Sequence, residues 1–515
     1  MATNLMYQLL SHVGRFSATS LLAGLDRIQA TIKRPRVFYP ILAGLLALLV
    51  RLTPVILSWP YPAGFDTTAY YLPLMVKGIP DLTWVFHNFS LQQLVLSLMY
   101  VAYPNAFVNL SVFAILLQIG LSLSVYSYSL RVQRFSERTA FLTSTMFTFS
   151  LITLRLGWDQ YRMMLALFFA IQVLTVLASQ NRRVKYLAVG FASLVILSNA
   201  LPAVLLILSL AVHLAWNYKR LNVLRAELVS LVAAVAVFGS QELFITAGNG
   251  VGSSVPFSTI PVSLGLAEST YGLLFLLIMS WPSLILLPLG VFRKLSGLHA
   301  PFLILTILCG LVPTVIGVYI VSPITVFWMA SFPLAIIFGT VMKANSQRIV
   351  KSFAILMLIF TIAIGFSFVV SSPEAPTLYL SLSQSFVHYF PNGYLQSTVP
   401  LSQEGNLIAL LDHSIPILPP NSTFVVPQQF YGLALMSQNP NQARIVNAGQ
   451  IGVAQNTIAP IPVNVNVTPI TSLESMHGSF TVWWTQPNNW YGVSELPSDF
   501  HVWLAGEGFS IFLIQ

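Results

Sequence analysis

Charged residues are scarce in this sequence of 515 residues: Asp, Glu, Lys and Arg together make up only 8% of it. A soluble protein carries about a quarter charged residues, so this chain lacks the charge needed to cover a water-facing surface. Hydrophobic residues make up 56% of the sequence, and the mean hydropathy is +0.77. This composition excludes an ordinary soluble protein and predicts a polytopic membrane protein.

Cysteine and acidic residues are also rare. The single cysteine, Cys309, lies inside an apolar run and cannot form an internal disulfide, which leaves the redox compartment open. The formal net charge of +9 first suggests a polyanionic partner, but from Glu374 onward the chain holds seven acidic residues and only one basic residue, Arg444. Basic residues in short loops mark the cytoplasmic side. The positive charge therefore indicates membrane orientation, and no nucleic acid partner is expected.

Long apolar runs separated by basic loops are abundant instead. Each run approaches the ~20 residues needed to cross the hydrocarbon. The continuous stretch 184–217 counts as two runs that turn near 198–202, because basic clusters flank it on both sides. The runs cover roughly 38–58, 104–130, 139–156, 161–179, 184–199, 201–217, 226–246, 271–291, 300–321, 324–342 and 351–371. The pattern predicts about eleven transmembrane helices in the plasma membrane, with a cytoplasmic N-terminus and an extracellular C-terminus.

Three parts follow from this division. Residues 1–37 are predicted to be a cytoplasmic amphipathic segment. Residues 38–371 form the transmembrane domain, with a first external loop at about 59–103. Residues 372–515 read as an external α/β domain, since EGNLIALLDHSI has a helical pattern and PPNSTFVVP, SFTVWWT and GFSIFLIQ resemble strands.

A few ionisable residues lie near the predicted outer ends of the spans. Asp66 follows the first span and Asp159 lies between the third and fourth, with Arg51, Arg155 and Arg162 nearby. Ionisable groups at membrane depth are costly, and they commonly line cavities or pair with one another. One interpretation is therefore structural ion pairs, such as Arg51 with Asp66 or Arg162 with Asp159. The other is a functional site that both carboxylates share at the outer face.

The segment RLTPVILSWPYPAGFDTTAYYLPLMVKGIP (51–80) resembles the start of GT-C class glycosyltransferases. These polytopic enzymes take sugar from polyprenyl-phosphate carriers at the outer membrane face. The matching elements are Arg51 late in the first span, Asp66 in the first external loop and Gly78 after an amphipathic turn. GWDQYRMMLALFF (157–169) is similar to the second acidic site of the class.

Two further segments extend the resemblance. The hairpin LSNALPAVLLIL (197–208) is similar to a family segment in which His often precedes the proline, although Asn199 departs from that pattern. The tail segment 405–427 resembles external domains of archaeal members. The resemblance thus points to an archaeal-type enzyme related to protein mannosyltransferases and oligosaccharyltransferases.

The resemblance implies a set of site residues. Asp66 is the expected general base, and Asp159 is a second acid that orients the acceptor or helps to hold a divalent cation. Guanidinium groups suit phosphate oxygens, so the expected phosphate contacts are Arg162, Arg51 and Lys77. Tyr70, four residues after Asp66, is expected to stack on a sugar. A cation, Mg²⁺ or Mn²⁺, would be held by Asp66 and Asp159 with Glu268, for which a solvated loop acid is the alternative.

The expected function is transfer of a sugar from a polyprenyl (dolichyl) phosphate to an acceptor at the outer face. The acceptor is left open as protein, lipid or glycan. The alternatives are a transporter, because charges on broken helices also mark substrate pathways, and a non-catalytic membrane assembly subunit. For Asp66 itself, a role as the cap of a short helix is the structural alternative.

Overall fold

The fold is known from a computed structural model, which describes residues 35–64, 66–220, 224–246, 258–291, 299–319, 322–344, 348–371, 401–448, 476–485 and 500–515, and short pieces at 394–395, 399, 450–451, 467–468, 473 and 496. The predicted amphipathic segment 1–37 falls almost wholly outside the described residues, as does most of the stretch 372–400.

A bundle of apolar helices forms the larger part of the protein. Five helical segments are long and apolar enough to cross a membrane, and a pair bent by 59°, α8 (Glu137–Phe149) with α9 (Leu151–Asp159), would be a sixth. The five lie in α3 (Pro35–Ser58), α7 (Ala106–Arg131), α15 (Val262–Leu284), α18 (Pro323–Phe327) continued by η3 (Trp328–Ala330) and α19 (Ser331–Ala344), and α20 (Arg348–Val370). The chain is therefore a multi-pass membrane protein, but eleven spans are not confirmed.

The remaining predicted runs are also helical, but several of their helices are short. They form α10 (Tyr161–Leu177), α11 (Arg182–Lys185), α12 (Leu187–Ser198), α13 (Ala200–Trp216), η2 (Tyr218–Arg220), α14 (Arg225–Thr246), α16 (Leu287–Val291) and α17 (His299–Val315). The predicted break in 184–217 is present: Asn199 is extended and its side chain caps α13 by accepting from the Leu201 amide at 3.0 Å. With 12 residues, α12 rises only ~18 Å, so two full crossings are not confirmed there.

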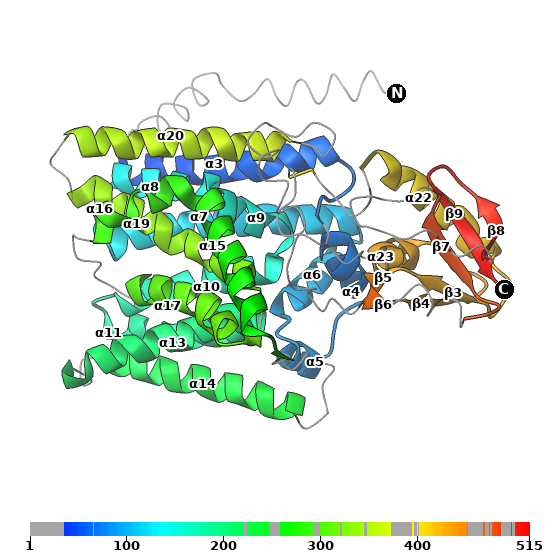
Figure 1. Ribbon diagram of the computed structural model, residues 1–515, viewed down its shortest axis with the longest axis horizontal. Helices are drawn as coiled ribbons and strands as arrows, with labels where there is room; N and C mark the ends of the chain where they lie inside the picture. Colours follow the sequence, from blue (N-terminus) through cyan, green and yellow to red (C-terminus); the bar gives the residue numbers. More distant parts are fainter. Residues whose placement is uncertain are drawn as a thin grey trace, which may run out of the picture.

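Many of the helices run in a similar direction, α15 crosses them steeply, and the C-terminal sheet lies at one end of the bundle (Figure 1). In that view α3 and α20 lie together along one edge and α13 and α14 along the other, in agreement with their contacts. In the last turn of α19, Lys343 donates a 2.8 Å hydrogen bond to the carbonyl of Gln133. Two of the predicted basic loops therefore lie side by side. The membrane side that each end faces stays a prediction.

The first predicted external loop is folded between the bundle and the sheet. It contains a π-helix, η1 (Thr67–Tyr71), followed by α4 (Leu72–Val76), α5 (Leu82–His87) and α6 (Leu91–Ala102). Asp81 begins α5 as its cap, because its side chain accepts from the Thr83 amide at 3.0 Å. The loop thereby places Asp66, directly before η1, at the junction of the two parts of the molecule.

The C-terminal part is a mixed sheet with helices beside it. Its strands stand in the order β4-β3-β7-β9-β8, with β3 parallel to β4 and β7, and β9 antiparallel to β7 and β8. The elements are α22 (Leu401–Ser414), η5 (Ile415–Ile417), β3 (Thr423–Val426), α23 (Gln428–Met436), β4 (Arg444–Asn447), β7 (Phe480–Trp484), β8 (Phe500–Ala505) and β9 (Phe509–Ile514). The helix and the three strands predicted for the tail are confirmed by α22, β3, β7 and β9.

Two short strand pairs complete the described elements. β1 (Ser258–Thr259) is antiparallel to β2 (Val318–Tyr319), and β5 (Gln450–Ile451) is parallel to β6 (Val467–Thr468).

Helix α23 packs directly on the loop that carries Asp66. At Gly432, a Cβ atom would lie 2.7 Å from the carbonyl oxygen of Thr68 and 2.8 Å from the Cδ of Pro73. Only glycine permits this approach of α23 to η1 and α4. Beside it, the Nζ of Lys77 lies 5.1 Å from the ring centre of Tyr431. The C-terminal part therefore packs against this loop.

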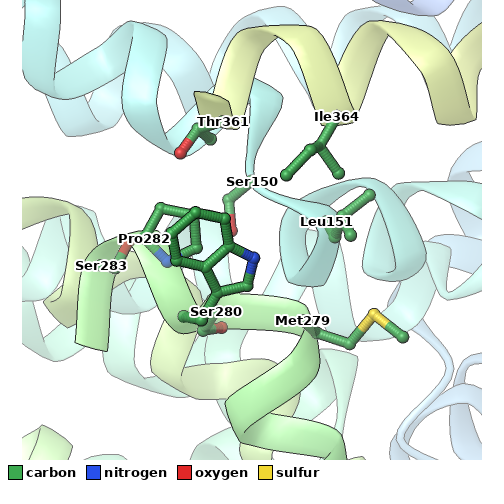
Figure 2. A pocket seen from close by; sticks show the side chains of 9 residues that line it. Ser150, Leu151, Met279, Ser280, Pro282, Ser283, Thr361 and Ile364 are labelled. Carbon is green, nitrogen blue, oxygen red and sulfur yellow. The ribbon is translucent and has the colours of Figure 1, made fainter. Parts of the chain in front are cut away.

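A cavity lies at the break between α8 and α9 (Figure 2). Ser150, the residue before α9, faces residues of α15 and α20 across this cavity. The wall combines hydroxyl groups with apolar side chains: Ser150, Leu151, Met279, Ser280, Trp281, Pro282, Ser283, Thr361 and Ile364. Asp159 lies at the other end of the nine-residue helix α9, ~12 Å away along its axis, so this cavity is separate from the acidic residues.

Candidate functional site

Asp66 and Asp159, 93 positions apart, converge where the loop before η1 meets the end of α9. The backbone amide of Asp66 lies 3.4 Å from Oδ2 of Asp159. The side-chain amide of Gln160 bridges the two carboxylates: its Nε2 lies 2.7 Å from Oδ2 of Asp66 and 2.9 Å from Oδ1 of Asp159. The structure thus brings together the two carboxylates that the sequence analysis assigned to one site.

The local backbone makes this convergence possible. Asp159 is the last residue of α9, and Gln160 separates it from α10. On the other side, Gly64 has a φ of +112°, and a Cβ there would lie 3.0 Å from both the Cβ of Asp159 and the carbonyl oxygen of Trp158. Glycine adopts such a φ without strain. It therefore lets the chain before Asp66 approach the end of α9.

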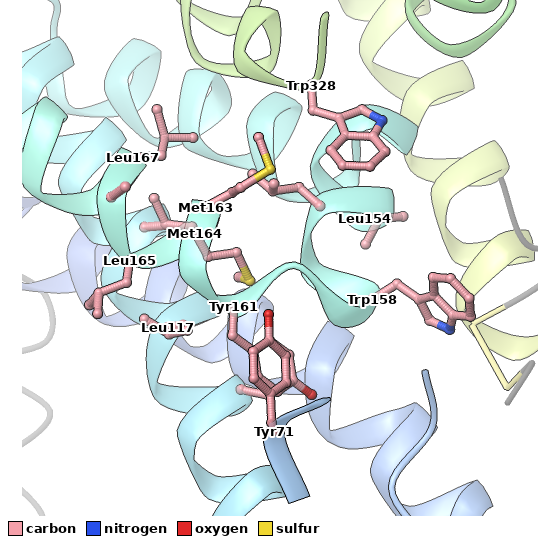
Figure 3. Packing of buried hydrophobic residues seen from close by; sticks show 14 of the residues in the cluster. Tyr71, Leu117, Leu154, Trp158, Tyr161, Met163, Met164, Leu165, Leu167 and Trp328 are labelled. Atoms are coloured by element: carbon pink, nitrogen blue, oxygen red, sulfur yellow. The ribbon is translucent and has the colours of Figure 1, made fainter. Parts of the chain in front are cut away.

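Arg155 fixes Asp159 from within the same helix. Its Nη1 lies 2.8 Å from Oδ1 of Asp159, one helical turn later, and both side chains are buried. The guanidinium carbon lies 4.9 Å from the ring centre of Trp158 and 4.4 Å from that of Trp328. Figure 3 shows these two indole rings on different segments of the core. Arg155 is therefore held by both tryptophans, which restricts where it can place Asp159.

The ion pairs considered from the sequence do not form in the described part of the chain. The Asp159 carboxylate forms its ion pair with Arg155 rather than Arg162. Arg51 donates instead to the carbonyl of Gly157 and the hydroxyl of Tyr161. The capping alternative for Asp66 is also wrong, because the Asp66 side chain makes no capping hydrogen bond to η1. The Asp66 carboxylate instead accepts a hydrogen bond from Gln160.

The helix that follows Asp66 is a π-helix. Its wider turn places Tyr71, rather than Tyr70, on the side of Asp66. A π-helix bonds residue i to i+5 and often marks functional sites. Tyr71, five residues after Asp66, is buried and stacks on Tyr161, with ring centres 5.0 Å apart and planes at 12° (Figure 3). Tyr70, the expected sugar contact, is 36% exposed instead. The i+4 spacing used for Tyr70 assumed an ordinary α-helix.

The surroundings of Asp66 raise the pKa of its carboxyl group well above the ordinary value. Burial, followed by the neighbouring Asp159 carboxylate, raises the pKa of Asp66 to about 8. Arg155, the hydrogen bond from Gln160 and Arg162 act in the opposite direction. A carboxyl group with a pKa in this range can exchange a proton near neutral pH, as a general base requires.

The two arginines expected to contact phosphate lie in different surroundings. Arg162 donates from Nη2 to the carbonyl oxygens of Asn88 and Phe89, at 3.0 and 3.2 Å, while its buried Nε has no partner in the described structure. Arg162 therefore keeps a donor for an added oxygen.

Arg51 has its terminal donors occupied. They bond the carbonyl of Gly157 at 2.9 Å, the hydroxyl of Tyr161 at 2.9 Å and the hydroxyl of Tyr394. Arg51 thus ties α3 to the segment that carries Asp159 and to the start of the tail. In this arrangement only its buried Nε has no partner among the described residues.

Two further candidates are Lys77 and Glu268. Lys77 is exposed and lies against Tyr431. Glu268 is buried in α15 with 1% of its side chain exposed, so it is not a solvated loop acid. Among the described residues, no three His, Cys, Asp or Glu side chains could hold a metal ion. Gln160 and Arg155 donate to Oδ1 of Asp159, and Gln160 also donates to Oδ2 of Asp66, so a cation between the two carboxylates would compete with these hydrogen bonds.

Several site residues were not found from the sequence. Gln160 lies between Asp159 and Arg162 in the motif GWDQYR, and a polar residue between two apolar runs could have marked it. Nothing in the sequence marked Tyr161 and Tyr71 as site residues, because aromatic residues are common in membrane helices. Tyr394 lies far along the chain, and only the fold brings it to Arg51.

Comparison with known proteins yields little. No family model matches this chain, and no curated protein matches it. Among solved structures, the chain is similar to the cryo-EM structure of the arabinofuranosyltransferase AftD from Mycobacteria, with 13% identity and a TM-score of 0.47. The similarity covers 92% of this chain but only 40% of AftD. A similarity of this degree assigns neither fold family nor activity, so the function has to be argued from the site.

Proposed function

We propose that this protein is a membrane glycosyltransferase that moves a sugar from a polyprenyl-phosphate carrier to an acceptor hydroxyl at the outer membrane face. The observation that carries the proposal is the pair Asp66 and Asp159, bridged by Gln160 where the apolar helices meet the outer loop. Two carboxylates that face each other at such a position are costly to maintain. They are linked through the Gln160 amide, and Arg155 forms an ion pair with Asp159. The Asp66 carboxylate has no ion pair among the described residues, which supports a chemical role for it over a purely structural one.

In the proposed reaction Asp66 acts as the general base. The acceptor oxygen forms a bond to the anomeric carbon of the sugar, and the bond from that carbon to the phosphate oxygen breaks. The electron pair leaves with the polyprenyl phosphate, and Asp66 takes the acceptor proton. The raised pKa of Asp66 supports this role. A general base works best when its pKa lies near the working pH, because its ionised form then accepts a proton readily.

The neighbouring residues have supporting roles in the proposal. Asp159, fixed by Arg155, orients the acceptor, and Gln160 keeps both carboxylates in place. Arg162 binds the phosphate, since its buried Nε–H has no partner among the described residues and guanidinium groups bind phosphate oxygens well. Arg51 holds α3, Gly157 and Tyr394 together and so acts as a positioning residue. Lys77 lies against the ring of Tyr431, so we assign it a contact with the C-terminal part rather than with substrate.

Glycan analysis tests the proposed function as a whole. Surface proteins, lipids and glycans from cells with and without this gene should differ by one sugar residue, detected by mass spectrometry. Membranes from the gene-containing cells should transfer that sugar from its polyprenyl phosphate to the acceptor. If the protein is instead a transporter or a non-catalytic assembly subunit, the purified protein should not transfer sugar in detergent. No difference in any glycan would contradict the proposal.

A further inference from the structure

Gln429 is a buried amide without a hydrogen-bond partner, next to the loop that carries the acidic pair. Its exposure is 0%, and neither Oε1 nor Nε2 bonds any part of the described structure. Buried polar side chains nearly always have partners, and an exception calls for an explanation such as a ligand or bound water. An amide that only filled space here would be replaced favourably by an apolar side chain.

The position of Gln429 on α23 directs it toward the bundle. Phe430, the next residue, packs on Trp484 of the sheet, with ring centres 4.4 Å apart. Gly432 touches Thr68 and Pro73 of the outer loop. Gln429 and Gly432 are three residues apart and so are neighbours on one face of α23. Gln429 therefore lies at the interface between α23 and the loop formed by η1 and α4, hereafter the α23–loop interface.

This interface adjoins the acidic pair. Thr68, which Gly432 approaches, is two residues after Asp66, and Gln429 is only ~4.5 Å further along the α23 axis. Helix α23 also starts at the carboxyl end of β3, which is parallel to both of its neighbours. Ligands of open α/β sheets bind beyond this edge of the strands.

We infer that the transferred sugar enters at the α23–loop interface and that the Gln429 amide binds its hydroxyl groups. A neutral amide donates from Nε2 and accepts at Oε1, which matches two adjacent hydroxyls and does not favour a charged group. The cavity at Ser150 is too far along α9 to take this role. Since the interface is closed around Gln429, sugar binding separates α23 from η1 locally. The inference rests on the proposed function, because it assumes a sugar-lipid donor.

A binding experiment on the full-length protein in detergent tests the inference without relying on catalysis. The probes are bare polyprenyl phosphate and the same lipid carrying mannose, glucose or galactose, and the variants are Gln429→Leu and its partly exposed neighbour Gln428→Leu. Wild type should bind one sugar-lipid more tightly than the bare lipid. Gln429→Leu should weaken that binding about tenfold and leave bare-lipid binding unchanged, whereas Gln428→Leu should match wild type.

The outcomes separate the inference from the proposed function. If Gln429→Leu binds the sugar-lipid as tightly as wild type does, the inference is overturned while the donor class stands. If wild type binds none of the lipids, the proposed donor is wrong and the inference falls with it. Thermal unfolding checks the fold: Gln429→Leu should unfold at no lower temperature than wild type, because it removes an unpartnered buried amide. A large drop would contradict the absence of a structural partner.

Discussion

Gln160 donates a 2.7 Å hydrogen bond from its side-chain amide to the carboxylate of Asp66, which lies 94 positions earlier in the chain. The same nitrogen lies 2.9 Å from Oδ1 of Asp159. One amide group thus links the first outer loop to the end of α9. It also reduces the repulsion between two carboxylates that would otherwise face each other alone.

Replacing this amide should impair the reaction. Gln160→Leu removes both hydrogen bonds to the carboxylates, each worth about 1.5–3 kcal/mol when the partner is charged. The transfer rate should fall about 100-fold, and the acidic limb of the pH–rate profile should move to higher pH, because the Gln160 hydrogen bond lowers the pKa of Asp66. Initial rates across pH are the measurement. A lower rate with an unmoved limb would make Gln160 a packing residue only.

The wild-type pH profile tests the assignment of the base. Asp66 must be ionised to accept a proton, and burial beside Asp159 raises its pKa to about 8. The ratio kcat/KM should therefore rise about tenfold per unit between about pH 6 and pH 8 and then level off. A profile that is flat over this range would show that no group with the raised pKa of Asp66 takes part.

The packing of α23 on the outer loop can be tested at Gly432. Gly432→Ala places a methyl group 2.7 Å from the carbonyl oxygen of Thr68, so the backbone must shift. We expect a loss of about 1–3 kcal/mol in the free energy of unfolding, seen as a lower Tm, and a lower transfer rate. Gly190→Ala in α12 is the control, since nothing lies within 4 Å of its added methyl group. Equal Tm values for both variants would contradict the described contact.

Because Glu404 in α22 is buried, we expect the stability of the C-terminal part to depend on pH. Its side chain is 1% exposed, its Oε2 has no partner among the described residues, and burial raises its pKa from 4.5 to about 8. Because the folded pKa exceeds the unfolded one, the stabilising contribution is complete below about pH 4.5 and is lost as the pH rises toward 8. Glu404→Gln should remove this loss and raise Tm at pH 8 relative to wild type.

The control for Glu404 is an exposed acid of the same sheet region. Glu507→Gln should leave the pH dependence of Tm as in wild type, since Glu507 is exposed. Thermal unfolding in detergent between about pH 5 and pH 8 is the measurement. If Glu404→Gln and wild type respond to pH in the same way, Glu404 is not held neutral in the folded protein.

The sequence predicted elements well where one physical signal dominates. Apolar runs marked the helices, the alternation in SFTVWWT marked β7, and the flanking charges of 184–217 marked the break at Asn199. The number of crossings was less predictable, because helix existence and membrane-spanning length are separate properties. The short helix α12 shows this difference.

The site was predictable only in part for a similar reason. Asp66 and Asp159 stood out because charge is rare in this chain, and their convergence followed from their common outer position. Gln160 had only a weak signal, a polar residue between two apolar runs, and the contacts of Gln160, Tyr71 and Tyr394 depend on details of the fold. These are a π-helix after Asp66, the turn between α9 and α10, and a tail segment that returns to Arg51.

The most direct measurement is the rate of sugar transfer by Asp66→Asn from a polyprenyl-phosphate donor. Asparagine preserves the size of the side chain, and Asp66 makes no capping hydrogen bond that folding requires, so the variant should fold normally, with a Tm no lower than that of wild type. If Asp66 is the general base, transfer should fall by about 10²–10⁴-fold, the usual contribution of a positioned acid or base. Transfer at the wild-type rate by folded Asp66→Asn would contradict the account.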